Sequence, residues 1–179
     1  MVYVHLADGF EEIEALTVVD VLRRADIAVK MVSVTDSKAV RGAHDIVVAA
    51  DLLFREADYG ICDMIVLPGG MPGTANLGKH EGLIKQLNIF AQEGRWLAAI
   101  CAAPSILGGL SLLNEKRATS YPGYESQMIG AIYTEERVVR DGNLITSRGP
   151  GTAIEFSLEL VTVLKNEQAA AALRNKMII

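Results

Sequence analysis

The stretch LAAICAAPSILGG, Leu97 to Gly109, places one cysteine after an apolar segment and three residues before a proline. The residues RWLAAI before Cys101 are typical of a buried strand. APSILGGLSLL after it is expected to begin a helix, with Pro104 in the first turn, where proline is tolerated. Small residues on both sides, Ala99 and Ala103, match the pattern of a nucleophile elbow. The alternative is that Cys101 is an inert, buried core residue.

An elbow would have three consequences for Cys101. The sharp turn predicts a strained backbone at the cysteine. The N-terminus of the following helix would lower the pKa of the thiol. The backbone N–H of Ala102 would face an oxyanion formed at the sulfur.

Short apolar segments alternate with helical patterns on both sides of this turn. Strands are expected at 2–7, 28–34, 64–68 and 95–100, a strand or hairpin at 44–54, a hairpin at 137–147, and helices at 11–27, 82–94, 103–113, 151–164 and 167–177. The strands lack polar alternation, which predicts a mostly parallel sheet with helices on both faces. The length of 179 residues suggests a single domain over residues 1–179.

Composition excludes several classes of protein. The net charge is -5 with no dense Lys/Arg cluster, which argues against nucleic acid as a partner. The longest apolar runs are too short or too interrupted to span a bilayer, so no membrane partner is expected. Two cysteines and no signal-peptide pattern favour a reducing cytoplasm. No His/Cys group has metal-ligand spacing, so neither a metal nor another cofactor is expected.

Unusual residues follow three of the expected strands, and the carboxyl ends of parallel strands meet at one edge of a sheet. Glu14, one residue beyond Ile13, is expected to face inward as a protonated carboxyl that can donate a hydrogen bond to a thiolate or sulfinate. Glu11 and Glu12 are expected to complement the helix dipole and to face solvent. Gly70 is expected to offer a second N–H to the oxyanion.

Two other motifs have weaker functional interpretations. Gly73 and Gly78-Lys79 match part of a phosphate-binding loop, but His80 stands where that loop needs Ser or Thr. Arg148, before Gly149-Pro150-Gly151 and a helix capped by Thr152, is a candidate partner for a substrate carboxylate or phosphate, or for an acid of the protein.

Together these motifs resemble the ThiJ/PfpI family, in the DJ-one-like branch of the parkinsonism-associated deglycase and chaperone. The matching segments are ADGFEEIEA, VDVLRRA, VLPGGMPG, AAICAAPSIL and SRGPGT, in family order over nearly the whole chain. The resemblance implies a flavodoxin-like α/β sandwich with a nucleophile elbow after a central strand, and a homodimer. It also implies that Cys101 is the oxidation-sensitive nucleophile, Glu14 its carboxyl partner, and Gly70 and Ala102 the oxyanion donors.

Further residues are implicated through the dimer. The resemblance suggests that Pro150 reaches the partner's site and that Ile13, Arg23 and Arg24 lie near the interface. Two departures from the family concern histidines. Family proteases carry histidine where this chain has Ala102, and the deglycase branch often has one where this chain has Tyr121.

The missing histidines disfavour peptidase activity. The expected function is therefore cofactor-independent glyoxalase or deglycase chemistry on a small aldehyde or a glycated substrate, with Cys101 as nucleophile and Glu14 as proton donor and acceptor. The rival hypothesis is an oxidative-stress sensor or redox-regulated chaperone that works through oxidation of Cys101.

Overall fold

The apolar segments form a seven-stranded sheet in the computed structural model, which describes residues 1–179. Its strands are β1 (Val2–Leu6), β2 (Val29–Ser33), β5 (Leu52–Leu53), β6 (Met64–Leu67), β7 (Trp96–Ile100), β10 (Val138–Asp141) and β11 (Leu144–Ser147). The order across the sheet is β10-β11-β7-β6-β1-β2-β5, and every pair is parallel except β10 with β11. The expected hairpin at 137–147 is this antiparallel edge pair.

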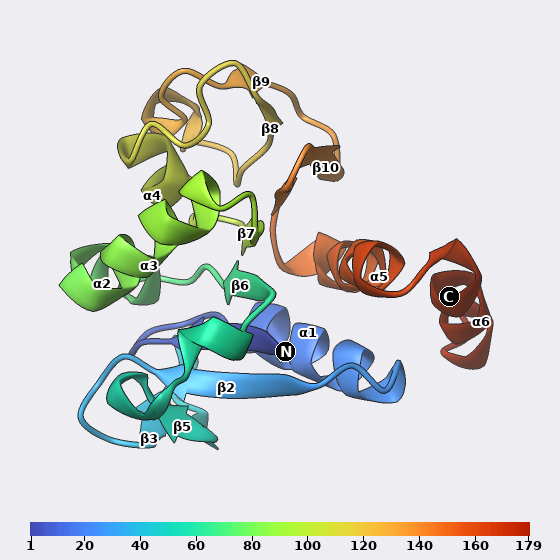
Figure 1. Ribbon diagram of the computed structural model, residues 1–179, viewed down its shortest axis with the longest axis horizontal. Coiled ribbons are helices and arrows are strands. Elements are labelled where there is room, and N and C mark those ends of the chain that lie inside the picture. Colours follow the sequence, from blue (N-terminus) through green and yellow to red (C-terminus); the bar gives the residue numbers. More distant parts are fainter.

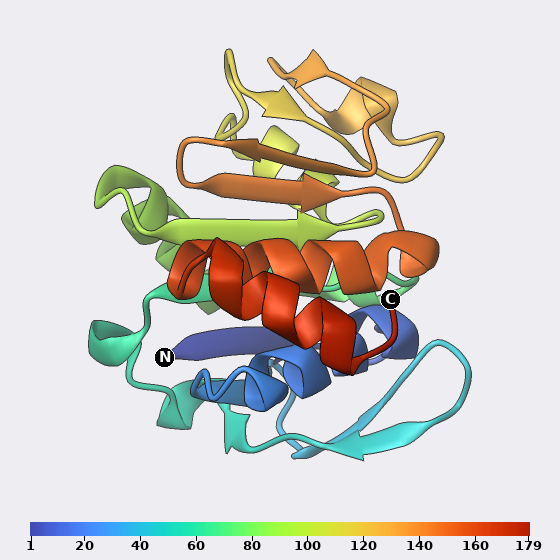
Figure 2. The same ribbon diagram turned by 90° about the vertical axis from the view of Figure 1, so that its right-hand side faces the viewer.

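Helices cover both faces of the sheet, as Figure 1 shows. One face carries α1 (Glu12–Arg24), α5 (Ala153–Leu164) and α6 (Glu167–Lys176), and the other carries α2 (Gly73–Lys79), α3 (Glu81–Gln92) and α4 (Pro104–Gly109). Figure 2 shows α5 and α6 crossing in front of the sheet. Each layer of helices encloses its own apolar core, of 26 and 19 buried residues. The expected flavodoxin-like three-layer sandwich is confirmed.

The remaining elements are short and lie outside the main sheet. They are the antiparallel pair β3 (Ala39–Arg41) and β4 (Val47–Ala49), the parallel pair β8 (Arg117–Ala118) and β9 (Ile132–Tyr133), and 3₁₀ turns at Phe54–Glu56, Tyr59–Ile61, Glu125–Gln127 and Pro150–Thr152. None of the helices combines the length and the apolar character that crossing a membrane requires.

Burial explains why these segments adopt these conformations. Every residue of β1 and of β6 is buried, which is the environment of a strand covered on both faces. On α1, Ala15, Val18, Val19 and Leu22 are buried at helical spacing, with acids in the first turn and Arg23 and Arg24 in the last. Of the apolar positions that the sequence suggests for this helix, Val19 and Leu22 are buried, whereas Leu16 is only partly buried and Ile13 is 56% exposed.

Three local expectations were wrong. The helix after Cys101 ends at Gly109, because two consecutive glycines favour helix poorly, and 110–115 form turns instead. Residues 44–54 divide between two sheets, since β4 pairs with β3 and β5 pairs with β2. Thr152 does precede α5, but its hydroxyl bonds to Gly149 rather than capping the helix.

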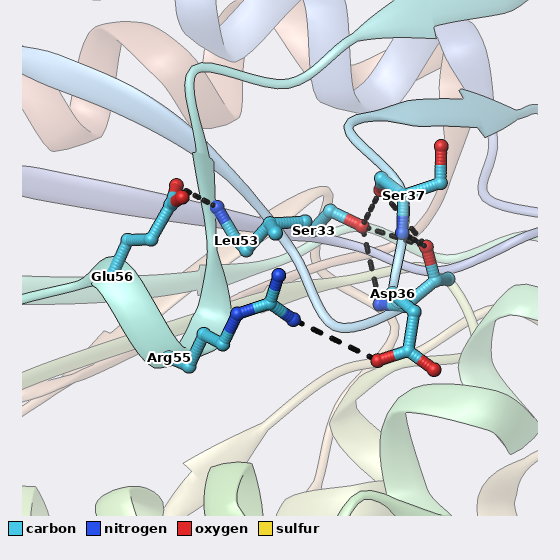
Figure 3. A network of polar contacts seen from close by, with 7 residues as sticks. Ser33, Asp36, Ser37, Leu53, Arg55 and Glu56 are labelled. Carbon is cyan, nitrogen blue, oxygen red and sulfur yellow. Dashed lines mark hydrogen bonds and ion pairs between the residues drawn. The ribbon is translucent and has the colours of Figure 1, made fainter.

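The far edge of the sheet is held by the polar network in Figure 3. The Ser33 hydroxyl, at the end of β2, donates to the Ser37 carbonyl at 2.7 Å. The Leu53 N–H donates to Glu56 at 2.9 Å, and Arg55 lies 3.8 Å from Asp36. These contacts tie the loop after β2 to the turn after β5.

The order in which strands are added to the sheet reverses between the neighbouring strands β1 and β6. From β1 the chain proceeds to β2 and β5 on one side, then returns to β6, β7 and β11 on the other. In parallel α/β sheets the crevice at such a switch in strand order is where ligands bind. The loops after β1, β6 and β7 therefore meet at the carboxyl edge of the sheet.

Candidate active site

Cys101 immediately follows β7 and has a φ of 63°, in the left-handed region that non-glycine residues rarely adopt. The strained backbone expected at this turn is present. The Cys101 N–H donates to the Ser147 carbonyl at 2.9 Å, and its carbonyl accepts from the Tyr121 N–H at 2.8 Å. Ala99 and Ala103 are fully buried, so the turn leaves no space for larger residues. Two backbone bonds thus hold the cysteine in its unfavourable conformation.

Glu14, in the first turn of α1, is fully buried beside this cysteine. Its Oε2 accepts the Gly69 N–H at 2.7 Å, and its other oxygen has no hydrogen-bond partner. Burial raises the pKa of Glu14 to about 7, with the charge of Glu11 acting in the same direction and the contact with Cys101 opposing it. The inward orientation expected for Glu14 is therefore observed, and the carboxyl can hold or release a proton near neutral pH.

Gly69 makes the meeting of these two side chains possible. A Cβ at this position would lie 2.6 Å from Cys101 Cβ and 2.8 Å from Glu14 Oε2. Both separations are far below van der Waals contact, so any side chain at Gly69 would push the carboxyl and the thiol apart.

The thiol has a higher pKa than the sequence suggests. Burial, followed by the charge of Glu14, raises the pKa of Cys101 to about 12. The backbone N–H groups of Ala102 and Gly70 act in the opposite direction and lower this pKa. The expectation that the helix N-terminus lowers the pKa is wrong, because α4 is only six residues long, begins at Pro104, and does not outweigh burial.

The two N–H groups converge on the sulfur from different loops. Gly70 follows β6 with a φ of 88°, and a Cβ there would lie 2.4 Å from the Glu11 nitrogen. Ala102 is the residue after the cysteine. N–H groups so placed stabilise negative charge on sulfur or on an oxygen bonded to it.

A cavity of about 250 Å³ opens onto the thiol. Its lining comprises Glu11, Gly70, Met71, Cys101, Ala102, Tyr121, Tyr124 and Pro150. The fold thus brings Tyr121 and Pro150 to Cys101. Arg148 lies instead in a neighbouring cavity of about 220 Å³ that shares Tyr121 and Pro150, and its Nη1 is buried without a hydrogen-bond partner.

Sequence reasoning did not identify Glu11, Met71 and Tyr124 as lining residues. The expectation that Glu11 and Glu12 face solvent is wrong, because they are 9% and 4% exposed. The sequence feature that could have indicated their burial is their position next to Glu14, which was expected to face inward. Donor atoms of Glu11, Glu12 and His44 lie within 4.8 Å of one another, a grouping invisible in sequence because His44 is 32 residues from Glu12.

Comparison with known proteins gives consistent matches over most of the chain. Residues 1–163 match the DJ-1/PfpI family. The Parkinson disease protein 7 homolog of Danio rerio is 37% identical over 180 residues, which cover 97% of this chain and 94% of that protein. A protein of Pyrococcus abyssi named a deglycase is 34% identical over 162 residues, 89% of this chain and 96% of that protein.

Longer relatives and solved structures agree with these matches. DJ-1 homolog B of Arabidopsis thaliana is 40% identical over 89% of this chain, but the match spans only 37% of the plant protein. The match to homolog A spans 44% of that protein. The structure of oxidized Toxoplasma gondii DJ-1 superposes with a TM-score of 0.95 at 36% identity, covering 99% of this chain and 97% of that one.

Proposed function

Because the chain belongs to the DJ-1/PfpI family, we propose that it is a cysteine-dependent enzyme that converts small reactive carbonyls at Cys101. The observation that carries the proposal is the convergence of a carboxyl and two N–H groups on one thiol. Glu14 Oε2 and the Cys101 sulfur both lie against Gly69, and the N–H groups of Gly70 and Ala102 lower the pKa of the thiol. The cavity of about 250 Å³ has room for a molecule the size of methylglyoxal.

The first step would be addition of the sulfur to the aldehyde carbon. As the carbon–sulfur bond forms, the thiol proton passes to the Glu14 carboxylate and the carbonyl electron pair moves to oxygen. The resulting oxyanion accepts hydrogen bonds from Gly70 and Ala102. A thiol of high pKa beside a carboxyl of pKa about 7 suits this transfer, because the proton leaves the sulfur only as the new bond forms.

The second step would rearrange the hemithioacetal. Glu14 would first return the thiol proton to the oxyanion, which leaves a hydroxyl on the former aldehyde carbon and a carboxylate on Glu14. The carboxylate would then remove the C–H proton from that carbon and deliver it to the neighbouring carbon, while the hydroxyl proton passes to the neighbouring oxygen, giving a thioester of a 2-hydroxyacid. Water then cleaves the carbon–sulfur bond, which releases lactate and restores the thiol. Methylglyoxal and one water molecule together have the composition of lactic acid. The reaction therefore needs no oxidant and no cofactor.

The deglycase named in Pyrococcus abyssi suggests glycated substrates as a related class. The same addition of sulfur to a carbonyl-derived carbon would begin that reaction.

A test of this function compares two side chains beside the thiol. Glu14→Gln should lower lactate formation from methylglyoxal by about 10²- to 10⁴-fold, because it removes the group that moves the proton. Tyr121→Phe should cost little, because Tyr121 is 46% exposed and contributes only a hydroxyl to the lining. Cys101→Ala should abolish turnover. If Tyr121→Phe is as inactive as Cys101→Ala while Glu14→Gln stays active, the role given to Glu14 is wrong.

A second candidate function is redox sensing or redox-regulated chaperone activity. The structure of oxidized Toxoplasma gondii DJ-1 and the converging N–H groups on Cys101 support it, since a sulfinate would use the same donors. Two assays on the purified protein separate the candidates. If it forms no lactate from methylglyoxal, and suppresses the aggregation of another protein only after peroxide treatment, redox-regulated chaperone activity is favoured over the enzyme.

A further inference from the structure

Two buried carboxylates and a histidine meet at the edge of the thiol cavity. His44 Nδ1 lies 2.8 Å from Glu12 Oε2 and 3.7 Å from Glu11 Oε2. Glu11 and Glu12 open α1, whereas His44 lies in the turn between β3 and β4. The isolated bridge between Phe10 and Gly42 holds these two segments side by side.

The charges of this cluster are unbalanced. Glu11 is 9% exposed, and no residue donates a hydrogen bond to its carboxylate, whose nearest cationic group is His44 at 3.7 Å. Glu12 is 4% exposed and already engages the same imidazole nitrogen. His44 and the backbone already occupy the Glu12 carboxylate, so the Glu11 carboxylate, which lines the thiol cavity, has no hydrogen-bond donor of its own.

The Glu12 carboxylate is held in place by the backbone. Its Oε1 accepts the N–H groups of His44 at 2.8 Å and of Ile46 at 3.4 Å. A Cβ on Gly42 would lie 2.2 Å from this oxygen, so only glycine admits the carboxylate here. Oε2 is left to face the imidazole and Glu11. The His44 side chain is 67% exposed, which gives an ion a route from solvent.

We propose that Glu11, Glu12 and His44 form a binding site for a divalent transition-metal ion, with Zn²⁺ the preferred occupant. One imidazole nitrogen and two carboxylate oxygens suit zinc, whose ligands lie at about 2.0–2.2 Å. The donor atoms of all three residues lie within 4.8 Å of one another. Small side-chain movements would bring them to the separations of roughly 3.3–3.6 Å that tetrahedral zinc ligands have. Mg²⁺ prefers an octahedral shell of oxygens and matches this donor set poorly. The site adjoins the thiol cavity through Glu11, but neither Cys101 nor Glu14 is among its ligands.

The test is calorimetric titration of the metal-free protein with ZnCl₂, supported by the visible spectrum of bound Co²⁺. We expect one saturable site in the wild type that persists in Cys101→Ala and is at least tenfold tighter for Zn²⁺ than for Mg²⁺. His44→Ala and Glu11→Gln should each weaken Zn²⁺ binding tenfold or more and remove the Co²⁺ absorption bands. His44 is exposed, so its replacement should leave the circular dichroism spectrum unchanged.

His80→Asn is the matched control. His80 Nδ1 accepts the Leu83 N–H at the start of α3, and asparagine can replace it as a helix cap. This variant should bind Zn²⁺ like the wild type. The proposal is overturned if the wild type shows no saturable binding, if His44→Ala binds as tightly as the wild type, or if Cys101→Ala loses the site. Equal loss in His80→Asn would also overturn it, because binding would then not be specific to the cluster.

Discussion

The thiols of Cys62 and Cys101 have similarly raised pKa values but differ in their exposure to solvent. Cys62 is 2% exposed, donates to the Met64 carbonyl at 3.2 Å, and burial raises its pKa to about 11. Cys101, with a pKa of about 12, is only partly buried and opens onto the cavity. The N–H groups of Gly70 and Ala102 can stabilise an oxidised sulfur on Cys101, and the cavity admits the oxidant, whereas Cys62 is buried away from this cavity.

We therefore expect mild peroxide to oxidise Cys101 before Cys62. Peptide mass spectrometry over a time course measures both sites in one sample. Equal modification of the two thiols, or Cys62 reacting first, would show that access and the N–H donors do not control oxidation. Complete unfolding in denaturant should remove the selectivity, which serves as the control.

At the scale of elements, the site depends on where strands end. Glu14 follows β1, Gly69 and Gly70 follow β6, and Cys101 follows β7. These three strands are neighbours in a parallel sheet, so their carboxyl ends bring together residues that are far apart in sequence. The alternation of apolar strands with amphipathic helices was sufficient to predict this convergence.

The start of α6 allows a prediction at the same scale. The Asn166 side chain accepts the Ala169 N–H at 2.8 Å and so caps the helix. Asn166→Ala should lower the free energy of unfolding by about 1 kcal/mol, while Asn166→Asp, which keeps the acceptor, should change it little. Urea denaturation of both variants measures the difference. An alanine variant as stable as the wild type would mean that the cap contributes nothing.

At the scale of the whole molecule, burial of His5 links stability to pH. His5 lies within β1, is fully buried, and its Nε2 is 2.6 Å from the Tyr59 hydroxyl. Burial lowers its pKa from 6.5 to about 3, with nearby His80 acting in the same direction. Between these two values the unfolded chain binds a proton that the folded chain does not. The free energy of unfolding therefore falls as pH drops below 6.5, by up to about 1.4 kcal/mol per pH unit.

His5→Gln isolates this contribution, because glutamine does not titrate and can still accept from Tyr59. Urea denaturation at pH 7.5 and pH 5 should show a larger loss of stability in the wild type than in the variant. Other titrating groups are common to both proteins and cancel in the comparison. Identical pH dependence in the two would remove His5 as a cause of acid sensitivity.

The expected homodimer is also a prediction about the whole molecule. Ile13 is 56% exposed on α1, an apolar side chain that a two-fold contact would cover. Light scattering at micromolar concentration should give twice the chain mass of 19.3 kDa. Pro150 lines the cavity of its own chain, and a monomer would exclude the further expectation that it reaches the site of a partner.

The sequence by itself determined the features that depend on local pattern. Apolar segments without alternation predicted a parallel sheet, helical spacing predicted the helix α1, and small residues around Cys101 predicted a strained turn. These follow from residues that are neighbours along the chain. Errors of local prediction arose where pairing partners were distant, as in 44–54, or where Gly108 and Gly109 ended a helix early.

Only the tertiary structure decided the electrostatics of the site. Burial of Glu11 and Glu12, the approach of His44 and the raised pKa of Cys101 all result from contacts between segments far apart in the chain. A glutamate at the start of a helix is predicted to be exposed to solvent, because the sequence does not show which distant segment packs over it. The cost of removing its charge from water depends on that packing, and packing is a property of the folded molecule.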